Sequence, residues 1–368
     1  MFKKAAFFIS LSILMSLTLT AVNQSGFPLI HHEDAIDLAK VKQQIANTKQ
    51  EAVLFDVAQD DISDKKFQRK GILVRRDNSI GTILICHGYL GCKRDAIALK
   101  HLFPSYNVMV FDFRAHGELT DGQLSTIGRD EALDVMGAAK FIKSDPEMSN
   151  KPVMVFGFSM GAVASIEAQS KDETLFDAMI LDCPFDSTDH SMRRGLDEKM
   201  KLSVFGKEMN LPGKELYLKN MYNESGIAQF ITSILFKQIT NLDSKQVETK
   251  FVRVSPIESI KKVTVPCLFI HCENDKKVPV TAVEGLYENK PGFKQLWITP
   301  GKKHFGSYND HPEKYWYRVN KFLQTIAADK IDQVAQERIY DDRSVTYDVA
   351  NAHLPTTLSE LRRTQPEK

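Results

Sequence analysis

Short apolar runs alternate with amphipathic helical patterns between about residues 66 and 326. The runs that read as β-strands are 70–75, 81–86, 107–112, 153–156, 178–182, 267–271 and 294–298. Several of them are continuously apolar, which is typical of strands covered on both faces. Helical patterns lie between them at 96–102, 128–142, 159–170 and 280–286. This alternation predicts an α/β fold with a doubly wound, mostly parallel sheet.

The interval 186–251 breaks this rhythm, because it shows amphipathic helix and no convincing strand. Its apolar positions 227, 230, 231, 234, 235 and 239 follow i, i+3, i+4, i+7 spacing and give one apolar face. The interval also holds Met192, Met200, Met209 and Met221. Methionine suits surfaces that accept varied apolar shapes. We expect a helical cap insertion, and two interpretations stay open: a cover over a ligand pocket or a packed structural element.

The cap divides the predicted core into two parts, 66–185 and 252–328. Residues 22–65 are expected to form an N-terminal extension. Residues 329–368 mix charges with prolines and lack a long apolar period, so we expect a peripheral C-terminal tail with one short helix around 330–339.

The first residues have the layout of an export signal. Lys3 and Lys4 precede the uncharged apolar stretch 5–22, which ends next to polar residues. This pattern predicts a signal peptide at 1–21, cleavage after Ala21 and an exported protein, periplasmic or secreted. The alternative is an uncleaved anchor that associates with a membrane through residues 5–22, although the stretch is short of the roughly 20 residues that span a bilayer.

Composition excludes several classes of protein. The 368 residues include 48 Lys+Arg and 47 Asp+Glu, for a net charge of +1. This balance argues against a nucleic-acid partner, which usually requires a basic excess. Five cysteines are too few for a disulfide scaffold, and an odd number leaves at least one unpaired. We expect buried free thiols, with one Cys183–Cys272 bridge as the alternative.

The segment Gly157-Phe158-Ser159-Met160-Gly161 carries chemistry, because it follows an apolar strand and opens a helix rich in small residues. A tight strand-to-helix turn forces the serine into a strained conformation and exposes its hydroxyl at the sheet edge, and the two glycines supply the room. The helix start places backbone N–H groups where an oxyanion would develop. The pattern predicts a nucleophilic serine.

With this segment and others in order, the chain resembles the α/β-hydrolase superfamily over roughly residues 66–326. The matching segments are HGYLG at 87–91, FDFRAHG at 111–117, GFSMG at 157–161, HCEND at 271–275 and GKKHFG at 301–306. Ala115 and Cys272 stand where the family usually has glycine. The resemblance implies a serine hydrolase with a helical cap, which needs no cofactor and no metal.

The residues implied for catalysis are Ser159, Asp275 and His304. A serine hydroxyl needs a base to become a good nucleophile, and His304 would take its proton. A carboxylate must then fix the imidazole tautomer and stabilise the imidazolium. The order Ser, Asp, His is the one expected for this fold. Asp182, which ends the preceding strand, is the alternative acid.

The oxyanion hole is expected to consist of the backbone N–H groups of Tyr89 and Met160. The expected reaction is cleavage of a carboxylic ester or thioester through an acyl-enzyme on Ser159. We expect a small-molecule or lipid-like acyl substrate, because an apolar, methionine-rich cap suits an acyl chain. The alternatives are an aminopeptidase-like serine peptidase, which needs an acidic group to hold a substrate amine, and a non-catalytic binding protein of the same fold.

Overall fold

The computed structural model describes residues 48–199, 201–204, 207–210, 217, 219–222, 225–240, 247–327 and 336–340. The predicted signal peptide or anchor at 1–21 and most of the predicted N-terminal extension lie outside the described residues. Within the part of the chain that is described, none of the helices combines the length and the apolar character needed to cross a membrane.

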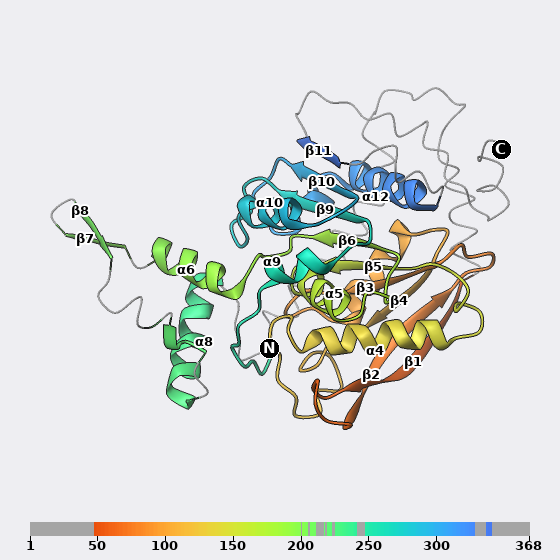
Figure 1. The fold of residues 1–368 in the computed structure, drawn as a ribbon, viewed down its shortest axis with the longest axis horizontal. Helices are drawn as coiled ribbons and strands as arrows, with labels where there is room; N and C mark the ends of the chain where they lie inside the picture. The colour runs from red at the N-terminus through yellow and green to blue at the C-terminus, as the bar shows by residue number, and fades with distance from the viewer. Residues whose placement is uncertain are drawn as a thin grey trace, which may run out of the picture. The chain divides into compact units, whose positions relative to one another are not determined.

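A nine-stranded sheet organises the described residues, with strand order β1-β2-β4-β3-β5-β6-β9-β10-β11 (Figure 1). The strands are β1 (Lys49–Ala58), β2 (Lys66–Arg75), β3 (Thr82–Cys86), β4 (Asn107–Phe111), β5 (Val153–Phe158), β6 (Ala178–Asp182), β9 (Cys267–Cys272), β10 (Lys294–Thr299) and β11 (Gln336–Tyr340). Neighbours from β4 to β11 are parallel, whereas β2 runs antiparallel to β1 and β4. All the strands expected from the apolar runs are present, which confirms the mostly parallel sheet.

Helices cover both faces of this sheet. They are α3 (Lys93–Ala96), η1 (Ile97–Leu102), α4 (Glu131–Ser144), α5 (Met160–Lys171), α9 (Pro256–Ser259), η2 (Ile260–Lys262), α10 (Val280–Asn289), α11 (Gly306–Asp310) and α12 (Pro312–Ala327). One hydrophobic cluster joins Val155 of the sheet to α4, α5 and α10, and a second joins Phe156 to η1 and α12. Successive strand residues face opposite sides, so a continuously apolar strand fills both clusters.

Two strands of the nine-stranded sheet lie where the sequence pattern did not place them. β1 falls in the predicted N-terminal extension, 22–65, and pairs antiparallel with β2 at the sheet edge. Its inward residues Val53, Phe55 and Val57 alternate with Leu54 and Asp56, a half-buried pattern much weaker than a continuous apolar run. The predicted core boundary at residue 66 is therefore too late.

The structure also differs from the prediction for the C-terminal tail. The helix expected around 330–339 is not formed over its second half, because 336–340 is the strand β11, parallel to β10. Residues 328–335 and 341–368 lie outside the described residues.

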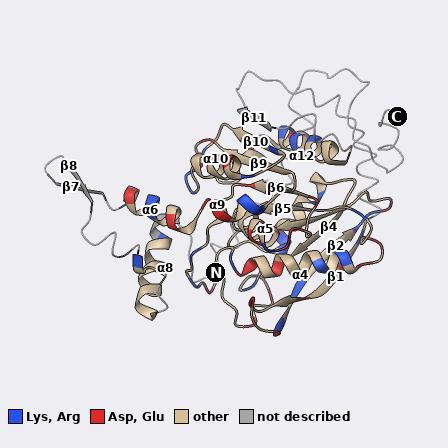
Figure 2. Cartoon of the chain, in the orientation of Figure 1, with Lys and Arg blue, Asp and Glu red and all other residues tan. Residues whose placement is uncertain are grey.

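The interval 186–251 contains the expected helices, α6 (Thr188–Lys199) and α8 (Gly226–Thr240). It also contains two short antiparallel strands, β7 (Lys201–Val204) and β8 (Lys207–Asn210), where none was expected. Strands of four residues are too short to give a periodic signal. Figure 2 shows that α6 carries charges of both signs, whereas α8 is almost free of charge. Most of the apolar face predicted on α8 is exposed, at Ile227, Phe230, Ile231 and Ile234.

The strand order determines where loops gather. The chain passes from β3 to β4 on one side and then returns to β5 on the other side of β3. Ligands bind outside the carboxyl ends of the strands at such a reversal. The loop 87–91 after β3 and Ser159 after β5 therefore lie beside each other at this point.

Candidate active site

Ser159 occupies a strained turn between β5 and α5. Its backbone has φ 51° and ψ −114°, a conformation that costs on the order of 1–3 kcal/mol for a residue other than glycine. A Cβ at Gly161 would lie 2.1 Å from the carbonyl oxygen of Cys86, so only glycine fits the close approach of α5 to β3. The Ser159 N–H donates to the Asp182 carbonyl at 2.8 Å, which ties the turn to β6.

The structure brings Ser159, His304 and Asp275 into one hydrogen-bonded series. The Ser159 Oγ lies 2.9 Å from His304 Nε2, and His304 Nδ1 lies 2.6 Å from Asp275 Oδ2. The Asp275 side chain is inaccessible to solvent, whereas 12% of the His304 side chain is exposed. With Asp275 ionised, His304 donates its Nδ1 proton to the carboxylate, and Nε2 is left to accept the serine proton.

The surroundings of Asp275 favour its ionised form. Burial raises the pKa of this carboxyl, but the hydrogen bond and charge of His304 and the Lys277 N–H outweigh burial and bring the pKa below the ordinary 3.8. The backbone N–H groups of Lys277 and Val278 donate to Asp275 Oδ1 at 2.7 and 3.2 Å. The loop after β9 thus fixes both oxygens of the carboxylate.

The alternative acid, Asp182, is bound elsewhere. Its Oδ2 accepts the hydroxyl proton of Tyr315 at 2.6 Å. Burial raises the pKa of Asp182 to about 6, even though the Tyr315 hydrogen bond acts in the opposite direction. His304 Nδ1 is hydrogen-bonded to Asp275. The geometry therefore gives Asp275 the contact that the sequence left open between two carboxylates.

The residues expected to form the oxyanion hole, Tyr89 and Met160, both line the cavity that contains Ser159. Met160 is the first residue of α5, where a backbone N–H has no partner within its own helix. Tyr89 lies in the turn closed by the hydrogen bond from the Gly91 N–H to the Gly88 carbonyl, 3.0 Å long. The Tyr89 hydroxyl is hydrogen-bonded to Thr249 at 2.6 Å, which connects this loop to the segment after α8.

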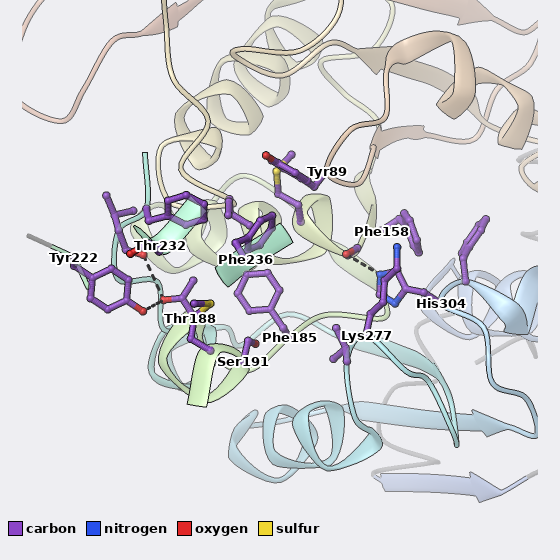
Figure 3. Close-up of a pocket in the computed structure, with 18 of the residues that line it drawn as sticks. Tyr89, Phe158, Phe185, Thr188, Ser191, Tyr222, Thr232, Phe236, Lys277 and His304 are labelled. Carbon is purple, nitrogen blue, oxygen red and sulfur yellow. Dashed lines mark hydrogen bonds between the residues drawn. The ribbon is translucent and has the colours of Figure 1, made fainter. Parts of the chain in front are cut away.

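The cavity beside Ser159 measures about 400 Å³ and is largely apolar. Its apolar wall includes Ile127, Met160, Phe185, Met192, Phe236, Phe251 and Val252. Figure 3 shows Tyr222, Thr188 and Thr232 at one end and His304 with Lys277 at the other. Residues of α6 and α8 thus line the cavity, but on α8 they are Thr232 and Phe236 rather than the predicted apolar face.

Most of this lining could not have been found from the sequence. Phe185, Phe236 and Phe251 come from three separate segments and share no motif. Lys277 carried a signal that the sequence reasoning missed, since it follows Asp275 by two residues in a loop at the carboxyl end of a strand.

One group of described residues offers possible metal ligands. Cys183, Asp275 and His304 present ligand atoms within 4.8 Å of one another. The last two are already joined by a short hydrogen bond, and burial keeps the pKa of the Cys183 thiol well above its ordinary value. A metal would have to break that bond and deprotonate the thiol, so we assign no metal. All five cysteines are free, and the alternative bridge to Cys272 is not formed.

The chain is similar in sequence to proteins of two bacteria. No family model matches the chain. The uncharacterized protein YqkD of Bacillus subtilis (strain 168) is 28% identical over 260 residues, which cover 70% of this chain and 75% of that protein. The uncharacterized protein YfhR of Escherichia coli (strain K12) is 24% identical over 251 residues, 67% of this chain and 71% of that protein.

Solved structures show the same arrangement. The Pyrococcus furiosus esterase Pf2001 superposes with a TM-score of 0.54 at 21% identity, covering 82% of this chain and 98% of the esterase. A thermophilic esterase from Thermogutta terrifontis gives 0.50 at 15% identity, covering 75% and 99%. The chain therefore has the α/β-hydrolase fold, as its motifs indicated.

Proposed function

We propose that this protein is a serine hydrolase that cleaves a carboxylic ester or thioester through an acyl-enzyme on Ser159. The observation that carries the proposal is the series from Ser159 through His304 to Asp275, with contacts of 2.9 and 2.6 Å. These contacts meet the distances required of a nucleophile and its base. The esterases of the same fold support the choice of reaction, but function must be argued from the site itself.

In the proposed reaction each group takes one step. Ser159 Oγ attacks the carbonyl carbon while His304 Nε2 takes its proton, and the carbonyl π electrons move to oxygen. The resulting oxyanion would be stabilised by the backbone N–H groups of Met160 and Tyr89. His304 then returns the proton to the leaving oxygen or sulfur as its bond to carbon breaks. Water repeats the sequence on the acyl-enzyme and releases the acid.

The cavity favours an apolar acyl group. Phe185, Phe236 and Phe251 contribute to the wall of the cavity that contains Ser159. Each methylene transferred from water to such a wall contributes about 0.8 kcal/mol. None of the described residues lining the cavity is an aspartate or glutamate, whereas an aminopeptidase needs a carboxylate to hold a substrate amine.

Covalent labelling tests the nucleophile. A fluorophosphonate probe should label the wild type, and Ser159→Ala should abolish the labelling. Ser191→Ala is the matched control, because Ser191 also lines the cavity but its hydroxyl donates to the Ser187 carbonyl. Folded wild-type protein that is never labelled would instead indicate a non-catalytic binding protein.

A substrate panel tests the reaction. We expect 4-nitrophenyl esters of short and medium fatty acids to be hydrolysed and aminoacyl 4-nitroanilides to be left intact, with Ser159→Ala inactive on both. Faster cleavage of the anilides would replace the esterase proposal with a peptidase.

Export is proposed from the sequence alone. The stretch 5–22 and the small residue Ala21 support cleavage of a signal peptide. N-terminal sequencing of the protein from its native host should begin at Val22. An intact N-terminus found with the membrane fraction would favour the anchor.

A further inference from the structure

Lysine pairs flank both of the residues that assist Ser159. The sequence reads Asp-Lys-Lys at 275–277 and Lys-Lys-His at 302–304. The two loops lie side by side, because the Glu273 N–H donates to the Thr299 carbonyl and the Asn274 N–H to the Gly301 carbonyl, both at 2.9 Å. The lysines are therefore gathered on neighbouring loops at the carboxyl ends of β9 and β10.

These four lysines form an exposed basic rim, defined as Lys276, Lys277, Lys302 and Lys303. None of them makes an ion pair with a described residue. The exposed carboxylates close to them in sequence are Glu273 and Asp310, which offset part of the positive charge. A chain with a net charge of only +1 thus concentrates cations beside the reacting groups.

Lys277 is the member of the rim that lines the cavity. Its backbone N–H is held by Asp275 Oδ1 at 2.7 Å, which fixes the start of the side chain. Figure 3 shows Lys277 at the same end of the pocket as His304, away from Tyr222. Among the described lining residues, Lys277 is the only lysine or arginine.

The proposed reaction places the leaving group at that end. His304 must give its proton to the leaving oxygen or sulfur, so the leaving group lies on the His304 side of Ser159. The acyl group then packs against the apolar wall formed by Phe185, Phe236 and Phe251. On the basis of the proposed function, we infer that Lys277 binds an anionic substituent, a carboxylate or a phosphate, on the leaving alcohol or thiol. The substrate class is then an apolar acyl ester of an anionic alcohol or thiol.

The expected effect is moderate because Lys277 is exposed. Solvent-exposed ion pairs contribute little free energy, and the contact with the cavity wall places this one at the upper end of their range. Loss of the charge should raise KM for an anionic ester about 3- to 5-fold. The effect should shrink as salt is added, because ions screen exposed charges.

Matched substrates test the inference. The hexanoyl ester of 4-hydroxybenzoate carries an anionic leaving group, and the hexanoyl ester of methyl 4-hydroxybenzoate is its neutral counterpart. The hexanoyl ester of 4-hydroxyphenyl phosphate is the phosphate arm. Each is assayed with wild type, Lys277→Gln, Lys277→Glu and Lys276→Gln. Lys276 is the control, because it is the adjacent exposed lysine that does not line the cavity.

We expect Lys277→Gln to raise the ratio of KM for an anionic ester to KM for the neutral ester, with a larger rise in this ratio for Lys277→Glu and no rise for Lys276→Gln. The arm with the larger change identifies carboxylate or phosphate as the preferred group. Equal losses in Lys276→Gln and Lys277→Gln, or no loss in either, would overturn the inference while hydrolysis of the neutral ester upholds the proposed function. Absence of both turnover and fluorophosphonate labelling would overturn the function, and the inference with it.

Discussion

Replacing Asp275 by Asn tests the assignment of the acid most directly. An amide at this position can donate to His304 Nδ1, which would place the imidazole proton on Nε2, facing Ser159. That tautomer cannot accept the serine proton. The wild-type contact is 2.6 Å long, and the carboxylate is inaccessible to solvent.

The size of the loss follows from this geometry. A hydrogen bond to a charged group contributes about 1.5–3 kcal/mol, and loss of the correct tautomer adds to it. The corresponding change in serine proteases lowers kcat about 10⁴-fold. We expect Asp275→Asn to lower kcat about 10³- to 10⁴-fold, or roughly 4–5.5 kcal/mol in the activation barrier.

Asp182→Asn is the matched control. Its amide oxygen can still accept the Tyr315 hydroxyl proton, a contact of 2.6 Å in the wild type. We expect kcat to fall less than about 10-fold, since Asp182 does not hold His304. Both variants are assayed on 4-nitrophenyl butyrate at pH 7.5, with circular dichroism to verify folding. Folded Asp275→Asn with near-normal kcat, beside an inactive Asp182→Asn, would refute the assignment.

The remaining predictions concern stability and the cavity wall. Burial raises the pKa of Asp182 from 3.8 to about 6, so the contribution of its protonated form to stability is complete below pH 3.8 and is lost as pH rises through about 6. The free energy of unfolding in urea should therefore decline less between pH 4 and pH 7 for Asp182→Asn than for wild type. Gly161→Ala should lower the free energy of unfolding by more than about 3 kcal/mol, because its Cβ would collide with the Cys86 carbonyl. Gly226→Ala has open space around its Cβ and should change the free energy of unfolding by less than about 1 kcal/mol. Equal urea midpoints for the two variants would contradict this prediction. Phe236→Ala should raise kcat/KM for octanoyl relative to butanoyl esters, and an unchanged ratio would place the acyl chain elsewhere.

The parts of the fold that the sequence predicted share one physical property. Central strands such as 108–111 and 153–157 are buried on both faces, so their residues are apolar or glycine and the signal is continuous. β1 is an edge strand whose outward positions mix polar and apolar residues, such as Gln50, Leu54 and Asp56, so its alternation is weak. The sequence is therefore informative where burial is complete and weak where a strand meets solvent.

The candidate site likewise contains residues that the sequence predicts and residues that it does not. Ser159 and His304 could be found because each lies in a short segment whose neighbours are constrained by backbone geometry, as the collision at Gly161 shows. The cavity wall has no such constraint. Phe185 and Phe251 reach it from loops separated in sequence, and any apolar residue of suitable size would serve. Sequence motifs are conspicuous where backbone segments pack tightly, whereas the shape of a pocket depends on how side chains from distant segments pack.

The choice between two carboxylates shows what geometry adds. Asp182 and Asp275 end or follow neighbouring parallel strands, so the sequence places both near His304. Burial acts against ionisation of each carboxyl, but only Asp275 accepts hydrogen bonds from His304 and from two backbone N–H groups. The pKa of Asp275 therefore falls, whereas the pKa of Asp182 rises to about 6. The negative charge of Asp275 in turn disfavours ionisation of Asp182. The hydrogen-bond donors of one loop thus determine which carboxylate ionises more readily, and residue type and spacing alone do not contain that information.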